Sequence, residues 1–232
     1  ERVYVAGLSA GGATAAILGA AYPDLYAAIG VHSGLPSGAA RDLPSAFAAM
    51  RQGAPGTGTA GGGGAVPTIV FHGDRDGTVH PGNGDAVAAQ ALAHPAARKA
   101  GLRATVERGQ TPGGRAFSRT VHADPSGSAL CEQWSIAGAG HAWAGGSPSG
   151  SYTDPAGPDA TREMLRFFLS HRNDRAGAAC QRSRAQPRRL QHRVRADQRQ
   201  ELLGIGLARE RPEPGARASG KNDGNHEYPL NK

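Results

Sequence analysis

The stretch YVAGLSAGGATAA, residues 4–16, passes from a short apolar strand through a turn of small residues into an Ala-rich helix. Its centre, Gly7 to Gly11, fits the pattern G-x-S-x-G around Ser9. Between a strand and a helix this pattern indicates a nucleophile elbow, in which a strained turn presents the serine hydroxyl at a helix N-terminus. Gly7, Gly11 and Gly12 are expected to let the strand and the helix approach closely. The competing interpretation is a Gly-rich turn with an incidental serine, so Ser9 needs catalytic partners elsewhere in the chain.

The remainder of the chain up to residue 174 alternates strand-like and helix-like segments. This alternation predicts an α/β fold with a doubly wound, mostly parallel sheet. Strands are expected at 2–6 (a buried strand), 27–32, 67–71, 102–109, 117–124 and 130–138, and helices at 10–21, 43–52, 84–94 and 158–171. The two strands within 103–124 are candidates for a local antiparallel hairpin. Asp42 or Ser45 is the candidate cap of the second helix, and a Gly-rich loop is expected at 53–64.

A nucleophilic serine requires a general base and a carboxylate that orients the base. On a sheet of this kind the chain order should be Ser, Asp or Glu, and then His. Asp74 and Asp76 both follow the apolar strand at 67–71. The spacing H-G-x-x-D places Asp76 beyond the turn, where it can reach a histidine, whereas Asp74 suits a role in capping or bracing the turn. We therefore predict Asp76 as the acid.

Nine histidines compete for the role of the base, and His141 has the most suitable position. It lies in GAGHAWAGG, after the strand at 130–138 and before the last helix, and glycines on both sides allow the loop to turn toward Ser9. His72 and His80 flank the predicted acid and are expected to make local hydrogen bonds.

Two further residues have open roles. His32 ends a strand, and we expect a structural histidine there, with lining of the site as the alternative. Trp143 lies two residues beyond His141 and either lines the substrate cleft or fills the core. No two histidines have the spacing of metal ligands near a set of carboxylates, so neither a metal site nor a cofactor is predicted.

Three blocks, residues 7–36, 67–87 and 138–168, together resemble the polyhydroxybutyrate depolymerase family of esterases, which has feruloyl and acetyl xylan esterase relatives. The resemblance covers about residues 2–172 and implies the α/β-hydrolase fold. Matched residue by residue, it implies Ser9 as the nucleophile, Asp76 as the acid and His141 as the base. The amide of Ala10 is then one donor of the oxyanion hole.

The same resemblance implies the substrates and the location of the protein. We expect hydrolysis of small or polymeric esters of hydroxyalkanoates, or of phenolic or acetyl esters of plant cell walls, by a protein that is extracellular. The strands that precede the elbow in an α/β-hydrolase have no counterpart before Glu1, so residues 1–174 are expected to be a partial catalytic domain lacking its N-terminal strands. The alternative to a serine esterase is an inactive hydrolase remnant, or a scaffold with a basic interaction tail.

Residues 175–232 are predicted to be a basic, disordered tail. Residues 1–174 carry 13 Lys and Arg against 13 Asp and Glu, so the net charge of +7 comes entirely from the tail, with 13 against 6. The tail is Arg- and Gln-rich and has little apolar periodicity, except near residues 197–208, where a short helix is expected. No aromatic residues alternate with its arginines, so nucleic acid is not an expected partner.

Two classes of feature are not expected anywhere in the sequence. No apolar run reaches the roughly 20 residues that a membrane-spanning helix requires. Cys131 and Cys180 have no disulfide or metal-binding pattern, so both are expected to be unpaired.

Overall fold

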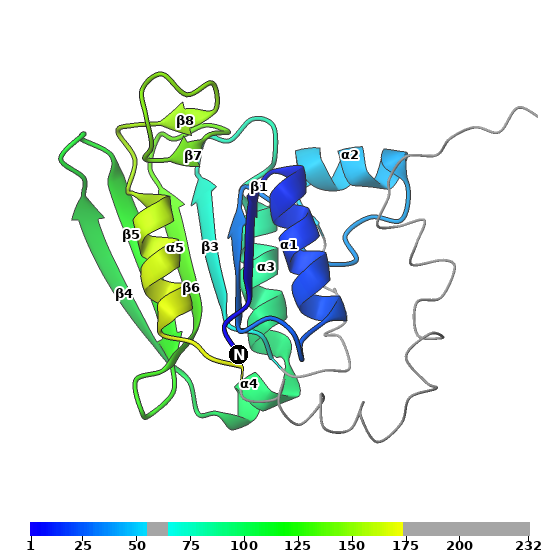
Figure 1. Ribbon diagram of the computed structural model, residues 1–232. Coiled ribbons are helices and arrows are strands. Elements are labelled where there is room, and N and C mark those ends of the chain that lie inside the picture. Colours follow the sequence, from blue (N-terminus) through cyan, green and yellow to red (C-terminus); the bar gives the residue numbers. More distant parts are fainter. Residues whose placement is uncertain (55–64, 174–232) are drawn as a thin grey trace, which may run out of the picture.

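The computed structural model describes residues 1–54 and 65–173, and a six-stranded sheet forms the centre of this part of the chain (Figure 1). The strand order is β1-β2-β3-β6-β5-β4. Four neighbouring strands are parallel: β1 (Tyr4–Leu8), β2 (Ala28–His32), β3 (Thr68–Gly73) and β6 (Ala129–Ile136). The sheet continues with β5 (Ala116–Ala123) and β4 (Arg103–Gln110), which pair antiparallel. The predicted α/β fold and the predicted hairpin are therefore confirmed.

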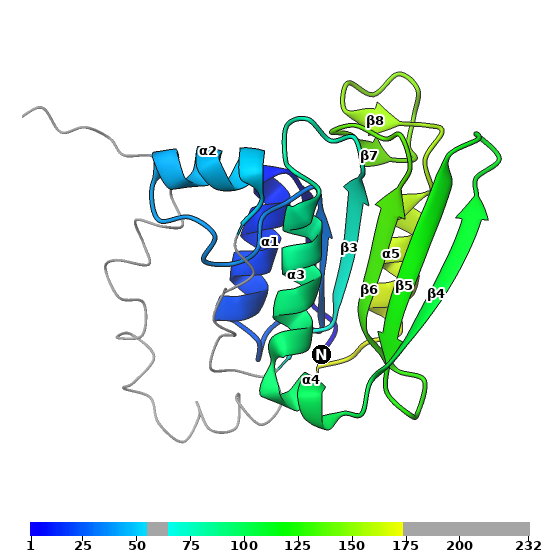
Figure 2. The ribbon, with the colours of Figure 1, turned by 180° about the vertical axis from the view of Figure 1, so that it is seen from behind.

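Helices cover both faces of the sheet. Figures 1 and 2, which view the molecule from opposite sides, show α1 (Ala10–Ala21) and α3 (Gly82–Ala93) on one face and α5 (Ala160–Leu169) on the other. Two adjacent residues of β2 reveal the two layers: the Ile29 side chain packs against Gly19 of α1, whereas a Cβ at Gly30 would contact Met164 of α5. Because side chains alternate along a strand, each face of the sheet builds its own core.

The core under α5 is aromatic, and the core under α1 and α3 is aliphatic. The first contains Phe71, Trp134, Phe167 and Phe168 among its buried residues. The second contains Ile29, Val31, Val70, Val87 and Cys131. Cys131 is free, and its burial, with a smaller contribution from the neighbouring carboxylate of Glu132, raises the pKa of its thiol to about 12. It is a core residue and not a reactive thiol.

A buried carboxylate joins α5 to the sheet. Glu132 of β6 is fully buried and accepts hydrogen bonds from Arg119 at 2.9 and 3.0 Å, from Arg166 of α5 at 2.5 Å and from the indole of Trp134 at 2.8 Å. Burial opposes ionisation, but these donors outweigh it and lower the pKa of Glu132. Its charge is therefore fully paired, as a buried charge must be.

Both candidate cap residues of the second helix act together. In α2 (Leu43–Gln52) the Asp42 carboxylate accepts from the Ser45 amide at 2.8 Å, while the Ser45 hydroxyl accepts from the Asp42 amide at 3.1 Å. This reciprocal arrangement is a capping box, with Ser in place of the usual Glu or Gln. The sequence left the choice open, and the structure uses both residues.

Several expectations need correction. The strand expected at 2–6 to be buried is the half-buried β1, and Ala6 is exposed, because within the described residues β1 is an edge strand with only β2 beside it. Three short elements were not anticipated: α4 (Pro95–Lys99), β7 (Trp143–Ala144) and β8 (Thr153–Asp154). Residues 55–64 of the expected Gly-rich loop, the expected basic tail with its helix near 197–208, and Cys180 lie outside the described residues.

Candidate active site

Ser9 occupies a strained turn between β1 and α1. Its φ of 59° and ψ of −120° are rare for a residue with a side chain, and it is the N-cap of α1. Hydrogen bonds hold this backbone: the Ser9 amide donates to the His32 carbonyl at 2.9 Å, and the Ser9 carbonyl accepts from the Ala13 amide at 3.0 Å. Ala10 is the first residue of α1, so its amide has no acceptor within the helix. The strand-turn-helix setting expected for a nucleophile elbow is present.

The glycines around Ser9 have unequal roles. A Cβ at Gly7 would lie 2.3 Å from the Gly11 carbonyl carbon, and one at Gly12 would lie 3.0 Å from the carbonyl oxygens of Gly7 and His32. A Cβ at Gly11 would meet nothing within 4 Å. The close approach therefore requires a glycine at positions 7 and 12, whereas the Gly11 backbone lies against Gly7 but has space for a side chain of its own.

Asp76 and His141 are brought together. The Nδ1 of His141 lies 2.8 Å from Oδ2 of Asp76, whose side chain is fully buried, and the His141 side chain is 15% exposed. The other carboxylate oxygen, Oδ1, accepts from the amides of Thr78 at 2.9 Å and Val79 at 2.8 Å. An ionised carboxylate only accepts, so Nδ1 of His141 carries a proton, and Nε2 is the nitrogen that has the lone pair when the imidazole is neutral.

The carboxyl of Asp76 is held in its ionised form. Burial opposes ionisation, but hydrogen bonds from His72, from the Val79 amide, from His141 and from the Thr78 amide outweigh it and hold the pKa of Asp76 below its usual range. A negative charge is therefore fixed beside His141, where it stabilises a positively charged imidazole.

His72 is a second histidine beside the same carboxylate. Its Nε2 lies 2.9 Å from the Val79 carbonyl oxygen and 3.4 Å from Oδ2 of Asp76. A carbonyl only accepts, so Nε2 carries a proton, and Nδ1 is the nitrogen that has the lone pair when the ring is neutral. That Nδ1 is buried near Gly84 and has no hydrogen-bond partner within the described part of the chain. The expected local hydrogen-bonding role of His72 is thus present, and its partners include the predicted acid.

Asp74 and His80 brace nearby turns. Oδ1 of Asp74 accepts from the amide of Gly138 at 2.7 Å, which ties the turn after β3 to the loop that carries His141. Nδ1 of His80 accepts from the Gly82 amide at 3.1 Å. The structure thus pairs His141 with Asp76 and gives Asp74 the bracing role expected of it.

Three loops at one edge of the sheet carry the predicted triad. Ser9, Asp76 and His141 follow β1, β3 and β6, which run parallel, and Figure 1 shows their carboxyl ends together at the upper end of the sheet. In open α/β sheets this edge is where ligands bind. Trp143 of β7 lies in the same region, stacked on His32 at 5.1 Å, with its indole N–H donating to Thr161 at 3.1 Å. It is half-buried beside the aromatic core.

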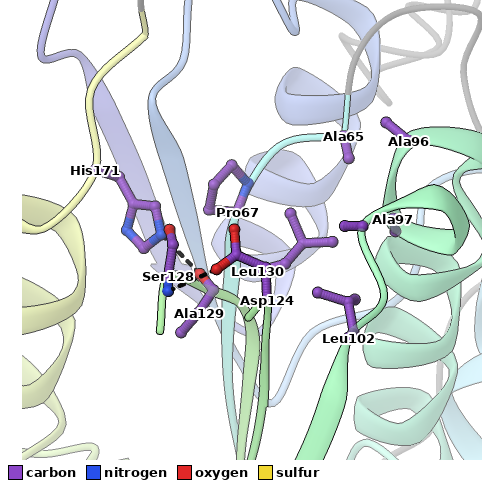
Figure 3. Close-up of a pocket in the computed structure, with 11 residues that line it drawn as sticks. Ala65, Pro67, Ala96, Ala97, Leu102, Asp124, Ser128, Ala129, Leu130 and His171 are labelled. Carbon is purple, nitrogen blue, oxygen red and sulfur yellow. Dashed lines mark hydrogen bonds between the residues drawn. The ribbon is translucent and has the colours of Figure 1, made fainter. Parts of the chain in front are cut away.

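A cavity of about 150 Å³ lies away from these residues. Figure 3 shows its lining, which includes Pro67, Leu102, Leu130 and His171, and none of the predicted triad. Pro67 precedes β3 and His171 follows α5, so the cavity is at the opposite edge of the sheet from Asp76. In residues 1–54 and 65–173 no cluster of His, Cys, Asp and Glu could hold a metal ion. None of the helices in these residues has the length and the apolar composition that a membrane span needs.

The mixed sheet with helices on both faces gives the described part of the chain the α/β-hydrolase fold. A PHB depolymerase in complex with an R3HB trimer has the same fold, with a TM-score of 0.51 and 21% identity over 72% of this chain and 51% of that one. Residues 1–108 match the family model described as Esterase PHB depolymerase, which confirms the resemblance over that part of the chain.

Two curated relatives of the chain are named as depolymerases. The chain is 33% identical to poly(3-hydroxyalkanoate) depolymerase C of Paucimonas lemoignei over 152 residues, which are 61% of this chain and 35% of that protein. It is 30% identical to poly(3-hydroxybutyrate) depolymerase of Ralstonia pickettii over 156 residues, 63% of this chain and 30% of the relative. The chain therefore spans about a third of the length of these relatives.

Proposed function

We propose that the protein is a serine esterase that hydrolyses carboxylic esters through an acyl-enzyme formed on Ser9. His141 is the general base and Asp76 orients it. The observation that carries the proposal is the 2.8 Å contact between His141 Nδ1 and the buried carboxylate of Asp76, which leaves Nε2 of His141 able to accept a proton. The strained turn at Ser9, at the same edge of the sheet, supplies the nucleophile.

The reaction proceeds in two balanced halves. As the Ser9 hydroxyl oxygen attacks the ester carbonyl carbon, Nε2 of His141 takes the hydroxyl proton, and the tetrahedral intermediate carries its negative charge on the former carbonyl oxygen. The bond to the alcohol breaks, and His141 returns the proton to the departing alcohol. Water then attacks the acyl-enzyme by the same route and releases the acid. Asp76 stays ionised throughout and stabilises the imidazolium.

The oxyanion is stabilised at the N-terminus of α1. The amide of Ala10 has no helical acceptor, and the positive end of the helix dipole lies beside it. In serine hydrolases the loss of one such donor lowers kcat by about 10² to 10³. Ala10 is therefore the proposed first donor of the oxyanion hole.

The proposed substrates are esters of hydroxyalkanoates, as oligomers or as the polymer. The names of the two curated relatives and of the structural neighbour support this class. Phenolic or acetyl esters of plant cell walls, which the family resemblance also includes, are the competing substrates. An extracellular location is proposed on the same resemblance.

The test measures release of 3-hydroxybutyrate from an R-3-hydroxybutyrate trimer by the full chain and by S9A, with acetylated xylan in parallel. The proposal expects the trimer to be cleaved, the xylan to be a poor substrate and S9A to be inactive on both. Equal turnover by the wild type and S9A would contradict the mechanism. An inactive wild type would favour the alternative of a hydrolase remnant or scaffold.

A further inference from the structure

His32, at the end of β2, is a buried histidine for which the proposed mechanism has no role. It is 1% exposed, and its ring stacks between Phe71 of the core at 5.7 Å and Trp143 of the β7 segment at 5.1 Å. Its Nε2 accepts a hydrogen bond from the amide of Ala144 at 3.0 Å. Its Nδ1 lies 3.3 Å from the hydroxyl of Ser33. Both ring nitrogens and both ring faces are therefore occupied.

The hydrogen bonds fix the protonation state of this ring. An amide only donates, so Nε2 of His32 must be unprotonated, and the proton is on Nδ1 facing Ser33. Burial, followed by the neighbouring His72 and His141, lowers the pKa of His32 to about 3, although the charge of Asp76 acts in the opposite direction. The ring is thus neutral near neutral pH and serves as a permanent acceptor for Ala144.

The same residue contacts both segments that must meet in the reaction. Its carbonyl oxygen accepts from the amide of Ser9 at 2.9 Å, and its ring nitrogen accepts from Ala144, three residues beyond His141. The Ser33 amide in turn donates to the Phe71 carbonyl at 2.9 Å, and Ser33 has a strained φ of 47°. The end of β2 is therefore fixed to β3 while it holds the serine turn on one side and the histidine loop on the other.

We propose that His32 is a positioning residue that fixes the segment carrying His141 relative to Ser9, through the acceptor at its Nε2. This inference rests on the proposed function. The proposed role of His32 differs from a purely structural one. If the loop that carries His141 loosens, the rate of proton transfer falls while the protein stays folded. Catalytic geometry of this kind is sensitive, since a displacement of about 1 Å can lower a rate about 100-fold.

Two substitutions separate the acceptor from the ring. His32→Gln has a side-chain amide oxygen that can still accept from Ala144, whereas His32→Phe retains a ring between Phe71 and Trp143 but has no acceptor. His122→Phe is the matched control, because it makes the same change at a histidine that is partly buried elsewhere in the sheet. His122 lies in β5, and this strand pairs with β4 and β6. All three variants are compared with the wild type in the full chain, with the melting temperature measured for each.

Steady-state hydrolysis of p-nitrophenyl butyrate is the first measurement. His32→Phe is expected to lower kcat about 10- to 100-fold at a temperature where it is folded, with KM nearly unchanged. His32→Gln is expected to retain most of the activity and His122→Phe all of it. An active wild type with a fully active His32→Phe would overturn the inference and leave the proposed function standing. A wild type without activity would refute the proposed function instead.

Amide hydrogen exchange at Ala144 is the second measurement and does not depend on activity. The Ala144 amide is expected to be protected in the wild type and in His32→Gln, and to exchange faster in His32→Phe. If His32→Phe does not fold, the wild type alone decides: rapid exchange at Ala144 would show that His32 does not hold the loop, and slow exchange would support it. Equal protection in the wild type and in a folded His32→Phe would also overturn the inference.

Discussion

Replacing Asp76 with Asn changes one hydrogen bond of the proposed triad and preserves the loop around it. The amides of Thr78 and Val79 donate to Oδ1 of Asp76, and an amide oxygen at that position accepts both. At the position of Oδ2 the variant has an NH₂ group, which donates toward His141 and removes the acceptor that lies 3.4 Å from Nε2 of His72. Nδ1 of His141 must then accept, and its proton moves to Nε2. In D76N the base has no lone pair left for the proton of Ser9.

The size of the effect follows from this reversal. In serine triads the wrong tautomer of the base lowers kcat about 10⁴-fold, which is about 5.4 kcal/mol of lost transition-state stabilisation. The native fold is expected to survive, because the two amide hydrogen bonds remain and the buried negative charge is removed rather than left unpaired. KM should change little, since Asp76 is fully buried and cannot touch the substrate.

The assay compares kcat on p-nitrophenyl butyrate for the wild type, D76N and D74N, with circular dichroism to establish that each is folded. D74N is the matched control: the same chemical change two residues away leaves an oxygen to accept from Gly138. D74N should keep nearly full activity. A folded D76N that retains more than about a tenth of the wild-type kcat, or a D74N as inactive as D76N, would refute the assignment of the acid.

Three further outcomes follow from the packing. In the unfolded chain His32 binds a proton below about pH 6.5, whereas the folded protein does so only near pH 3. As the pH is lowered from 6.5 to 3, protonation of His32 in the unfolded chain should therefore lower the free energy of unfolding by about 4 kcal/mol. Urea titrations of H32Q over the same pH range should lack this decrease. Gly7→Ala should destabilise the fold by several kcal/mol, since its Cβ would lie 2.3 Å from the Gly11 carbonyl carbon. Gly11→Ala, the control, should be neutral or stabilising. A Gly7→Ala variant as stable as the wild type would contradict the close approach of Gly7 and Gly11. Glu132→Gln should lower the free energy of unfolding by about 2–4 kcal/mol without changing kcat, because the buried arginine contacts of Glu132 lose their charged partner. The exposed Glu107→Gln should lower it by at most about 1 kcal/mol. Equal effects of the two substitutions would contradict a stabilising role for the buried carboxylate.

The sequence was sufficient to predict the elements that have strong local signals. The bounds of α1 and α2 are those expected, because an Ala-rich run after a small-residue turn, and a run preceded by capping residues, depend on neighbours in the chain. The pairing of Asp76 with His141 was also accessible, because two loops that follow parallel strands of one sheet share an edge. The roles of Ser9, Asp76 and His141 in a reaction remain predictions.

Features that depend on distant contacts were not accessible from the sequence. From the sequence alone, His32 is only a polar residue at the end of a strand. Its hydrogen bond with the Ala144 amide joins residues that are 112 positions apart in the chain. The burial of β1 was overestimated because an apolar sequence does not reveal whether a strand has one neighbour or two. β7 and β8 contain two residues each, too few for a periodic pattern.

The most direct test of the proposed chemistry is covalent labelling of the full chain with a fluorophosphonate, followed by peptide mapping. The proposed mechanism predicts one adduct, on Ser9, formed rapidly in the wild type, much more slowly in His141→Ala and not at all in Ser9→Ala. A chain that takes up no label, or whose label lies on another serine and persists in Ser9→Ala, would contradict the assignment of Ser9 as the nucleophile.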